Sequence, residues 1–201
     1  MRNARFAVLF ALLLAWLAAP AAANDLGRPL SLVAAPELKD PVYGGTVLLV
    51  KPFGRDQHLG FIVNRPTNFT LGKLFPEHAP SQEVEDPVFL GGPFDAGVIF
   101  ALVVQPDSPG GNAIEMAPGL FAVHEAATVD KIIEANPEEA RFVAGLVIWR
   151  PGELRKEIEI GAWQVRDAEP ALAVRDPKGL WESLVKPSER SRNLLRTGLA
   201  R

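Results

Sequence analysis

Two neighbouring polar side chains, Asn64 and Arg65, are the first candidates for chemistry in this sequence. They follow an apolar run that ends at Val63, and Pro66 comes next. An arginine guanidinium offers a planar fork of donors to a carboxylate or phosphate, and an asparagine amide both donates and accepts. The pair suits an anionic ligand. A turn in which Arg65 pairs with a nearby acid fits the same residues.

A second candidate is the glycine pair Gly91 and Gly92, which follows a short apolar run and precedes Pro93. Consecutive glycines can expose backbone N–H groups as an anion-binding nest. The segment lacks the lysine of a P-loop and does not match the dinucleotide-binding pattern. The alternative is a tight turn at a strand end where no side chain fits.

The third candidate segment runs from Trp149 to Glu153 and joins an apolar run to a predicted helix. Gly152 and Glu153 lie at the helix start, where the helix dipole favours a carboxylate, and Trp149 is expected in the core. This segment and Asn64-Arg65 both leave apolar strands at their C-terminal ends. Because binding residues collect on loops held by a rigid scaffold, we predict that the two segments meet in one cleft.

Several kinds of catalytic site are not indicated. The sequence has no cysteine, which excludes disulfides, a thiol nucleophile and thiolate metal ligands. Its three histidines, His58, His78 and His124, do not have the spacing of zinc ligands, and no serine lies in a G-x-S-x-G motif. We therefore predict no metal and no cofactor, and a non-enzymatic domain. An enzyme with an acid–base site near Asn64, Arg65 and Glu153 is the alternative.

The N-terminus has the order of a secretory signal peptide. Arg2 and Arg5 precede an apolar run from Phe6 to Ala19, and small residues at 21–23 suit cleavage before Asn24. The run is short of the roughly 20 residues that span a bilayer, so cleavage is favoured over a retained anchor. We therefore predict a signal peptide at residues 1–23 and a periplasmic or secreted protein.

Composition narrows the class of partner. The whole chain has a formal net charge of −3, and loss of two arginines with the signal makes the mature protein more acidic. Nucleic-acid affinity depends largely on basic surface, so specific nucleic-acid binding is not expected. Residues 24–185 are expected to form one domain, and residues 186–201 a basic tail. The predicted partners are an unidentified protein or a small anionic ligand, with no transmembrane segment after cleavage.

The elements alternate irregularly, which favours an α+β fold over a doubly wound parallel one. Apolar or β-branched runs predict strands, and capping residues or prolines predict short helices. The predicted strands are 30–35, 45–50, 59–64, 88–90, 97–104, 120–123, 140–149, 163–166 and 172–174, with 45–50 and 59–64 as a hairpin. Helices are expected over 71–75, 128–135 with a Thr128 cap, 152–160 and 177–185. Residues 80–86 are expected to be a polar loop.

Four blocks taken in order resemble the YqgE/AlgH family of bacterial proteins. They are S-L-V-A-A-P from Ser31, G-F-I-V-N-R-P from Gly60, V-F-L-G-G-P from Val88 and G-L-V-I-W-R-P-G-E-L from Gly145. The resemblance covers about residues 28–185. It implies an α+β fold with a mixed, largely antiparallel bifurcated sheet that partly closes into a small barrel flanked by helices.

The resemblance implies little about activity. Some family members are labelled regulators of transcription, and no enzyme activity is established for the family. This sequence departs from the family pattern by its export signal and at Leu146, Ile148, Glu153 and Arg155. The favoured interpretation is an exported binding or interaction protein of undefined biochemical role. A transcriptional regulator and an enzyme are the alternatives.

Overall fold

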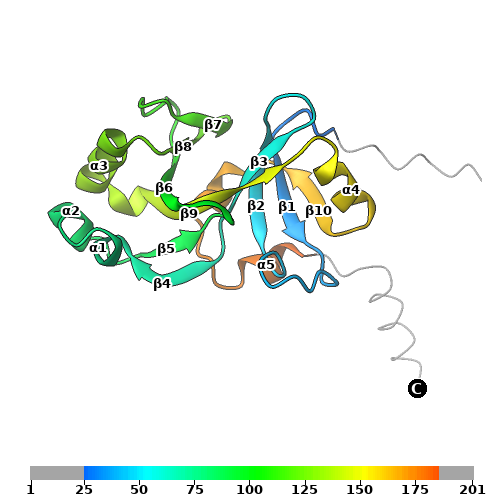
Figure 1. Cartoon of the computed structure of the whole chain (residues 1–201), viewed down its shortest axis with the longest axis horizontal. Coiled ribbons are helices and arrows are strands. Elements are labelled where there is room, and N and C mark those ends of the chain that lie inside the picture. Colours follow the sequence, from blue (N-terminus) through cyan, green and yellow to red (C-terminus); the bar gives the residue numbers. More distant parts are fainter. Residues whose placement is uncertain (1–24, 186–201) are drawn as a thin grey trace, which may run out of the picture.

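A computed structural model describes residues 25–185 of the chain (Figure 1). The predicted signal peptide and the predicted basic tail lie outside the described residues. The described strands are β1 (Leu30–Ala34), β2 (Val47–Pro52), β3 (His58–Ile62), β4 (Pro66–Thr70), β5 (Pro87–Leu90), β6 (Phe94–Val104), β7 (Ile114–Ala117), β8 (Leu120–Val123), β9 (Ala140–Trp149) and β10 (Trp163–Asp167). The helices are α1 (Leu71–Leu74), α2 (Ala79–Gln82), α3 (Ala126–Ala135), α4 (Glu153–Glu159) and α5 (Leu180–Leu184), with 3₁₀ turns η1 (Pro137–Glu139) and η2 (Pro170–Ala173).

The strands form one sheet that forks at β9. The main path runs β10-β1-β2-β3-β9-β6-β8-β7, and β4 and β5 branch from it. The end of β9 near Trp149 pairs with β3, whereas Val143 and Ala144 pair with β5, the one parallel pairing among the described strands. This confirms the predicted α+β fold with a bifurcated, largely antiparallel sheet.

We call β1, β2, β3 and β10 with α4 and α5 the barrel side of the molecule (Figure 1). Strands β1 and β2 are buried on both faces, because alternate side chains serve two different cores. Leu32 and Leu48 pack toward α4, whose Leu154 lies in the same cluster. Val33 and Leu49 pack into the interior, where the sheet curls around Phe61, Phe100 and Leu102.

We call α1, α2 and α3 with β6, β7 and β8 the helical side (Figure 1). A third cluster joins these helices to the outer face of β6 and β8, with Leu71, Val123, Val129 and Ile133 among its members. Helix α1 begins where predicted, since the Thr70 hydroxyl accepts a hydrogen bond from the N–H of Lys73. Among the described residues, no helix is both long and apolar enough to cross a bilayer.

Three local predictions were wrong: a loop, a strand and a helix cap. The expected polar loop at 80–86 begins with helix α2, because Pro80 suits the first turn of a helix. The expected strand at 172–174 is the turn η2, and a short apolar run cannot by itself separate a strand from a buried turn. Thr128 does not cap α3: that helix begins at Ala126, and the Thr128 hydroxyl donates to the carboxylate of Glu125.

Candidate functional site

Asn64 and Arg65 hold the chain segment that precedes β2. The Asn64 amide accepts a hydrogen bond from the N–H of Val47 (2.8 Å) and donates to the carbonyl of Gly45 (3.0 Å). The Arg65 guanidinium donates to the carbonyls of Pro41 (2.8 Å), Val42 (2.6 Å) and Gly44 (3.3 Å). These contacts span 17 to 24 residues of sequence. Arg65 is therefore a structural clamp, and the prediction of an anionic ligand there loses its basis.

The glycine pair lies at the fork of the sheet and does not form an anion nest. The N–H groups of Gly91 and Gly92 both donate to the carbonyl of Ala144, and the Gly91 carbonyl accepts from Ile62. A Cβ at Gly92 would lie 2.2 Å from the backbone of Leu146. Glycine is needed here because two backbones come too close for any side chain. This is the tight-turn alternative that the sequence left open.

The side chains of Trp149 and Glu153 also form hydrogen bonds within the protein. Trp149 is buried, and its indole N–H donates to the Glu157 carboxylate (2.8 Å), which also accepts from the indole of Trp163 (2.7 Å). Glu153 accepts from the backbone N–H of Arg150 (2.7 Å) at the start of α4. Gly152, with φ of 79°, provides the left-handed residue before that helix. Trp149 thus lies in the core as predicted.

The predicted cleft that joins these segments is wrong. Strands β3 and β9 are antiparallel, and Trp149 at the end of β9 pairs with His58 at the start of β3. Asn64 follows the opposite end of β3, about 20 Å away at roughly 3.3 Å per residue. The C-terminal ends of antiparallel neighbours point in opposite directions, so loops that follow them cannot share one edge.

The buried cation Arg141 on β9 also has a structural role, which the sequence analysis missed. Its guanidinium donates to the carbonyls of Val63 and Arg175, both at 2.7 Å, and lies 4.1 Å from the ring centre of Phe89. Burial lowers the pKa of Arg141, while the carboxylates of Asp86 and Asp176 oppose that shift. Arg141 therefore joins three segments.

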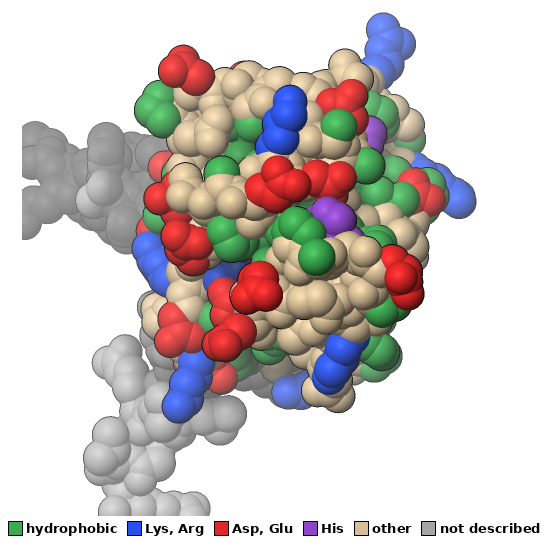
Figure 2. All heavy atoms as spheres, turned by 90° about the vertical axis from the view of Figure 1, so that its left-hand side faces the viewer, with side chains coloured by type: hydrophobic (Ala, Val, Ile, Leu, Met, Phe, Trp, Pro, Cys, Tyr) green, Lys and Arg blue, Asp and Glu red, His purple; other side chains and the backbone are tan. Residues whose placement is uncertain are grey.

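An apolar cavity of about 450 Å³ lies on the helical side, between α1 and α2 on one wall and α3 and β6 on the other. We call it the helical cavity. Figure 2 shows this side of the molecule, with acidic side chains around a hollow where hydrophobic side chains and histidine are visible. The cavity is lined by Leu71, Phe75, His78, Ser81, Gly97, Val98, Ile99, His124, Ala126, Val129, Asp130 and Ile133.

Three polar side chains form one corner of the helical cavity. Nδ1 of His78 lies 2.7 Å from the hydroxyl of Ser81, which is only 1% exposed. Nε2 of His78 lies 3.7 Å from a carboxylate oxygen of Asp130 on α3. Asp130 is about half exposed, so its charge faces both the cavity and solvent. The corner can therefore accept a hydrogen bond or a positive charge.

A second apolar cavity, of about 340 Å³, lies along the first half of β6. We call it the sheet cavity. It shares Val98 and His124 with the helical cavity. The His124 ring packs edge-on against Phe100, with ring centres 5.6 Å apart. The sheet cavity is lined by Phe53, Leu59, Phe61, Phe94, Asp95, Val98, Phe100, Ile114, His124, Leu146 and Ile148.

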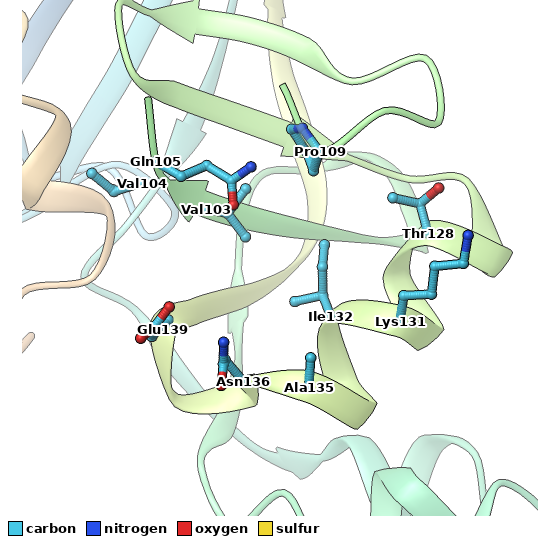
Figure 3. A pocket seen from close by; sticks show the side chains of 10 residues that line it. All are labelled: Val103, Val104, Gln105, Pro109, Thr128, Lys131, Ile132, Ala135, Asn136 and Glu139. Atoms are coloured by element: carbon cyan, nitrogen blue, oxygen red, sulfur yellow. The ribbon is translucent and has the colours of Figure 1, made fainter. Parts of the chain in front are cut away.

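A third hollow, of about 170 Å³, lies between α3 and the end of β6 (Figure 3). The side chain of Ile132 points into it, with Lys131 and Thr128 at one end and Asn136 and Glu139 at the other (Figure 3). Ligand pockets usually measure about 300–1,000 Å³, so this hollow is small for an organic ligand. The two larger cavities are the better candidate site.

The cavity residues carry no motif, so the sequence alone does not reveal them. His78 and Ser81 have a helical three-residue spacing, but Ser81 falls in the segment predicted as a loop, 80–86, and His78 lies just before it. His78 and His124 are far apart in the sequence and line one cavity, yet they do not gather with acids into a metal site. In the part of the chain that the structure describes, no group of three or more metal-ligating side chains occurs.

Comparisons with known sequences identify one family. A family model described as AlgH-like, DUF179, matches residues 31–190. A UPF0301 protein of Streptomyces coelicolor is 34% identical over 165 residues, which is 77% of this chain and 83% of that protein. A UPF0301 protein of Chlorobium phaeobacteroides is 31% identical over 159 residues, with the same coverage of each chain.

Two solved structures share the fold. The solution structure of the AlgH protein from Pseudomonas aeruginosa matches with a TM-score of 0.63 and 24% identity, over 76% of this chain and 82% of that one. The crystal structure of the protein DIP2367 from Corynebacterium diphtheriae matches with a TM-score of 0.64 and 22% identity, over 79% and 85%. At these identities the likeness concerns the fold alone.

Proposed function

Since the chain belongs to the AlgH-like family of uncharacterised proteins, we propose that its mature domain is an exported, non-enzymatic binding protein whose ligand occupies the helical cavity. The export part rests on the signal-like order of residues 1–23. The binding part rests on the described residues of the helical side.

One observation carries the binding proposal: the helical cavity has the size and lining of a ligand pocket. Its volume of about 450 Å³ lies within the usual range, and most of its lining side chains are apolar. His78, Ser81 and Asp130 place a few polar groups at one corner, and such groups typically orient a ligand.

A binding role fits better than the enzyme that the sequence offered as an alternative. That enzyme needed Asn64, Arg65 and Glu153 in one cleft, but these groups lie at opposite ends of β3. All three also have internal hydrogen-bond partners. A regulator of transcription is less favoured, because acidic side chains predominate on the face shown in Figure 2 and would repel a phosphate backbone.

Ligand binding can be tested with a neutral apolar dye, N-phenyl-1-naphthylamine, whose fluorescence rises in an apolar site. The purified protein should bind it with saturation. Gly97→Phe should abolish binding, because a Cβ at Gly97 meets no atom within 4 Å and the phenyl ring can fill the cavity without a backbone clash.

Ala171→Phe is the matched control, since it adds the same ring at an exposed position of η2, away from the cavity lining. It should bind the dye like the parent protein. Equal dye binding by parent and Gly97→Phe protein, with both folded, would contradict the proposed site.

Export is tested separately by N-terminal sequencing of the protein from a bacterial host that expresses the whole chain. We expect Asn24 as the first residue, in the periplasmic or secreted fraction. An intact Met1 on protein from the cytoplasmic fraction would overturn the export part and leave the binding part standing.

A further inference from the structure

The helical and sheet cavities adjoin at two lining residues, and we call the pair the apolar path. They share Val98 and His124, and their volumes are about 450 and 340 Å³. Each is lined mainly by apolar side chains, among them Phe75 in the first and Phe94 in the second. Such a path suits an extended apolar chain better than a compact one.

The formal charges that line this path all have one sign. Asp130 faces the helical cavity from α3, and Asp95 faces the sheet cavity from β6. The other titratable lining groups are His78 and His124, and no lysine or arginine lines either cavity among the described residues. Acidic side chains also surround the hollow in Figure 2. An anionic head group would meet repulsion here, whereas a cationic one would be attracted.

We propose that the two cavities bind a single-chain cationic amphiphile, an unbranched alkyl chain that ends in an ammonium group. The proposal rests on the proposed binding function and names its ligand class. The ammonium group lies beside Asp130, at the polar corner with His78 and Ser81. The alkyl chain passes Val98 and His124 toward Phe94 and Ile148.

Asp130 is the better partner for the head group because its carboxylate lies in a polar corner. Nε2 of His78 lies 3.7 Å from Asp130, and the other ring nitrogen, Nδ1, is hydrogen-bonded to the buried Ser81 hydroxyl. These contacts orient the carboxylate and the imidazole at the opening of an otherwise apolar cavity. Asp95 is instead an exposed residue of β6 that lines the sheet cavity together with the apolar side chains of Phe53, Phe94 and Ile148.

The test compares three ligands with the same chain and different heads: decylammonium, decanol and decanoate. Isothermal titration calorimetry on the purified full-length protein is run at low ionic strength and about pH 7.5, where carboxylates are charged. Decylammonium should bind most tightly, decanol less and decanoate least. Octylammonium should bind more weakly than decylammonium, because each buried methylene adds roughly fourfold in affinity.

Two variants locate the head group. Asp130→Asn should weaken decylammonium binding about three- to fivefold, as expected for a partly exposed charge pair, and leave decanol unchanged. Asp95→Asn should leave decylammonium binding within about twofold, since the head does not lie there. Dye binding by both variants, at the parent level, reports that the cavity is intact.

Decanoate binding as tightly as decylammonium overturns the cationic amphiphile and leaves the proposed binding function standing if decanol binds. An effect of Asp95→Asn in place of Asp130→Asn overturns the assignment of Asp130 as the partner of the head group. Failure of all three ligands and of the neutral dye overturns both.

Discussion

The barrel side and the helical cavity differ in how their polar side chains are used. On the barrel side, Asn64, Arg65 and Glu157 each serve two or more internal hydrogen bonds, mostly to distant backbone. On the helical side, His78 and Asp130 face a cavity and solvent. The residues that the sequence suggested as ligand-binding groups therefore hold the fold together. The residues that line the proposed binding cavity look ordinary in the sequence.

The largest expected effect tests how tightly the sheet closes at its fork. Gly92→Ala should cost more than about 4 kcal/mol in the free energy of unfolding, or prevent folding. The reason is that the new Cβ would lie 2.2 Å from the backbone of Leu146. Chemical denaturation measures the loss.

Gly97→Ala is the control on the helical side, where a Cβ meets nothing within 4 Å. Its stability should stay within about 1 kcal/mol of the parent protein, on the stabilising side, because alanine restricts the unfolded chain. Equal stability of Gly92→Ala and Gly97→Ala would show that the fork is no more tightly packed than the first half of β6.

The next effect concerns the carboxylate shared by two buried indoles. Glu157→Ala should cost about 3 kcal/mol, because the N–H groups of Trp149 and Trp163 lose their common acceptor inside the protein. Glu157→Gln keeps an acceptor oxygen and should cost only about 1 kcal/mol. Urea unfolding curves of the three proteins decide this. A similar loss in both variants would assign the effect to charge.

A smaller loss of stability is expected when the structural arginine Arg65 is removed, and it can be compared with the loss of the exposed Arg150. Arg65→Ala should cost about 2 kcal/mol, because the carbonyls of Pro41 and Val42 lose a charged donor. Arg150→Ala should cost less than about 0.5 kcal/mol, since its side chain is 85% exposed and its ion pair with Glu153 spans 4.0 Å. Thermal and urea unfolding provide the measurement. Equal losses would mean that Arg65 is no more structural than an exposed arginine.

The smallest expected effect is a pH dependence on the barrel side. Burial, followed by the nearby charges of Glu157 and Asp40, raises the pKa of Tyr43 above its usual value of 10.0. Below about pH 10 the phenol is neutral in both states and its contribution is fully present. As pH rises through the folded-state pKa, that contribution is lost, because the unfolded chain ionises first.

The difference between parent and Tyr43→Phe protein isolates this group. The variant should lose less stability than the parent between about pH 9 and pH 11, measured by urea unfolding. Parallel pH profiles for the two proteins would show that Tyr43 is not perturbed by its place in the fold.

The sequence by itself determined most of the strands and the family. Strand β1, the β2–β3 hairpin and the long strand β9 follow from apolar, β-branched runs bounded by glycine and proline. Helices α1 and α4 also lie within one residue of the predicted ranges 71–75 and 152–160. These features depend on near neighbours along the chain, so the local pattern contains the necessary information.

Tertiary structure alone decided which residues meet. The direction of β3 relative to β9 separates Asn64 from Trp149, and no local pattern encodes that direction. The carbonyls that engage Arg65 lie more than 20 residues earlier in the chain. The helical cavity joins residues from Leu71 to Ile133, on four separate elements and their loops. A backbone carbonyl has the same chemistry at every residue, and a cavity wall leaves no motif in the sequence. Only the path of the chain through space therefore determines which side chains lie next to them.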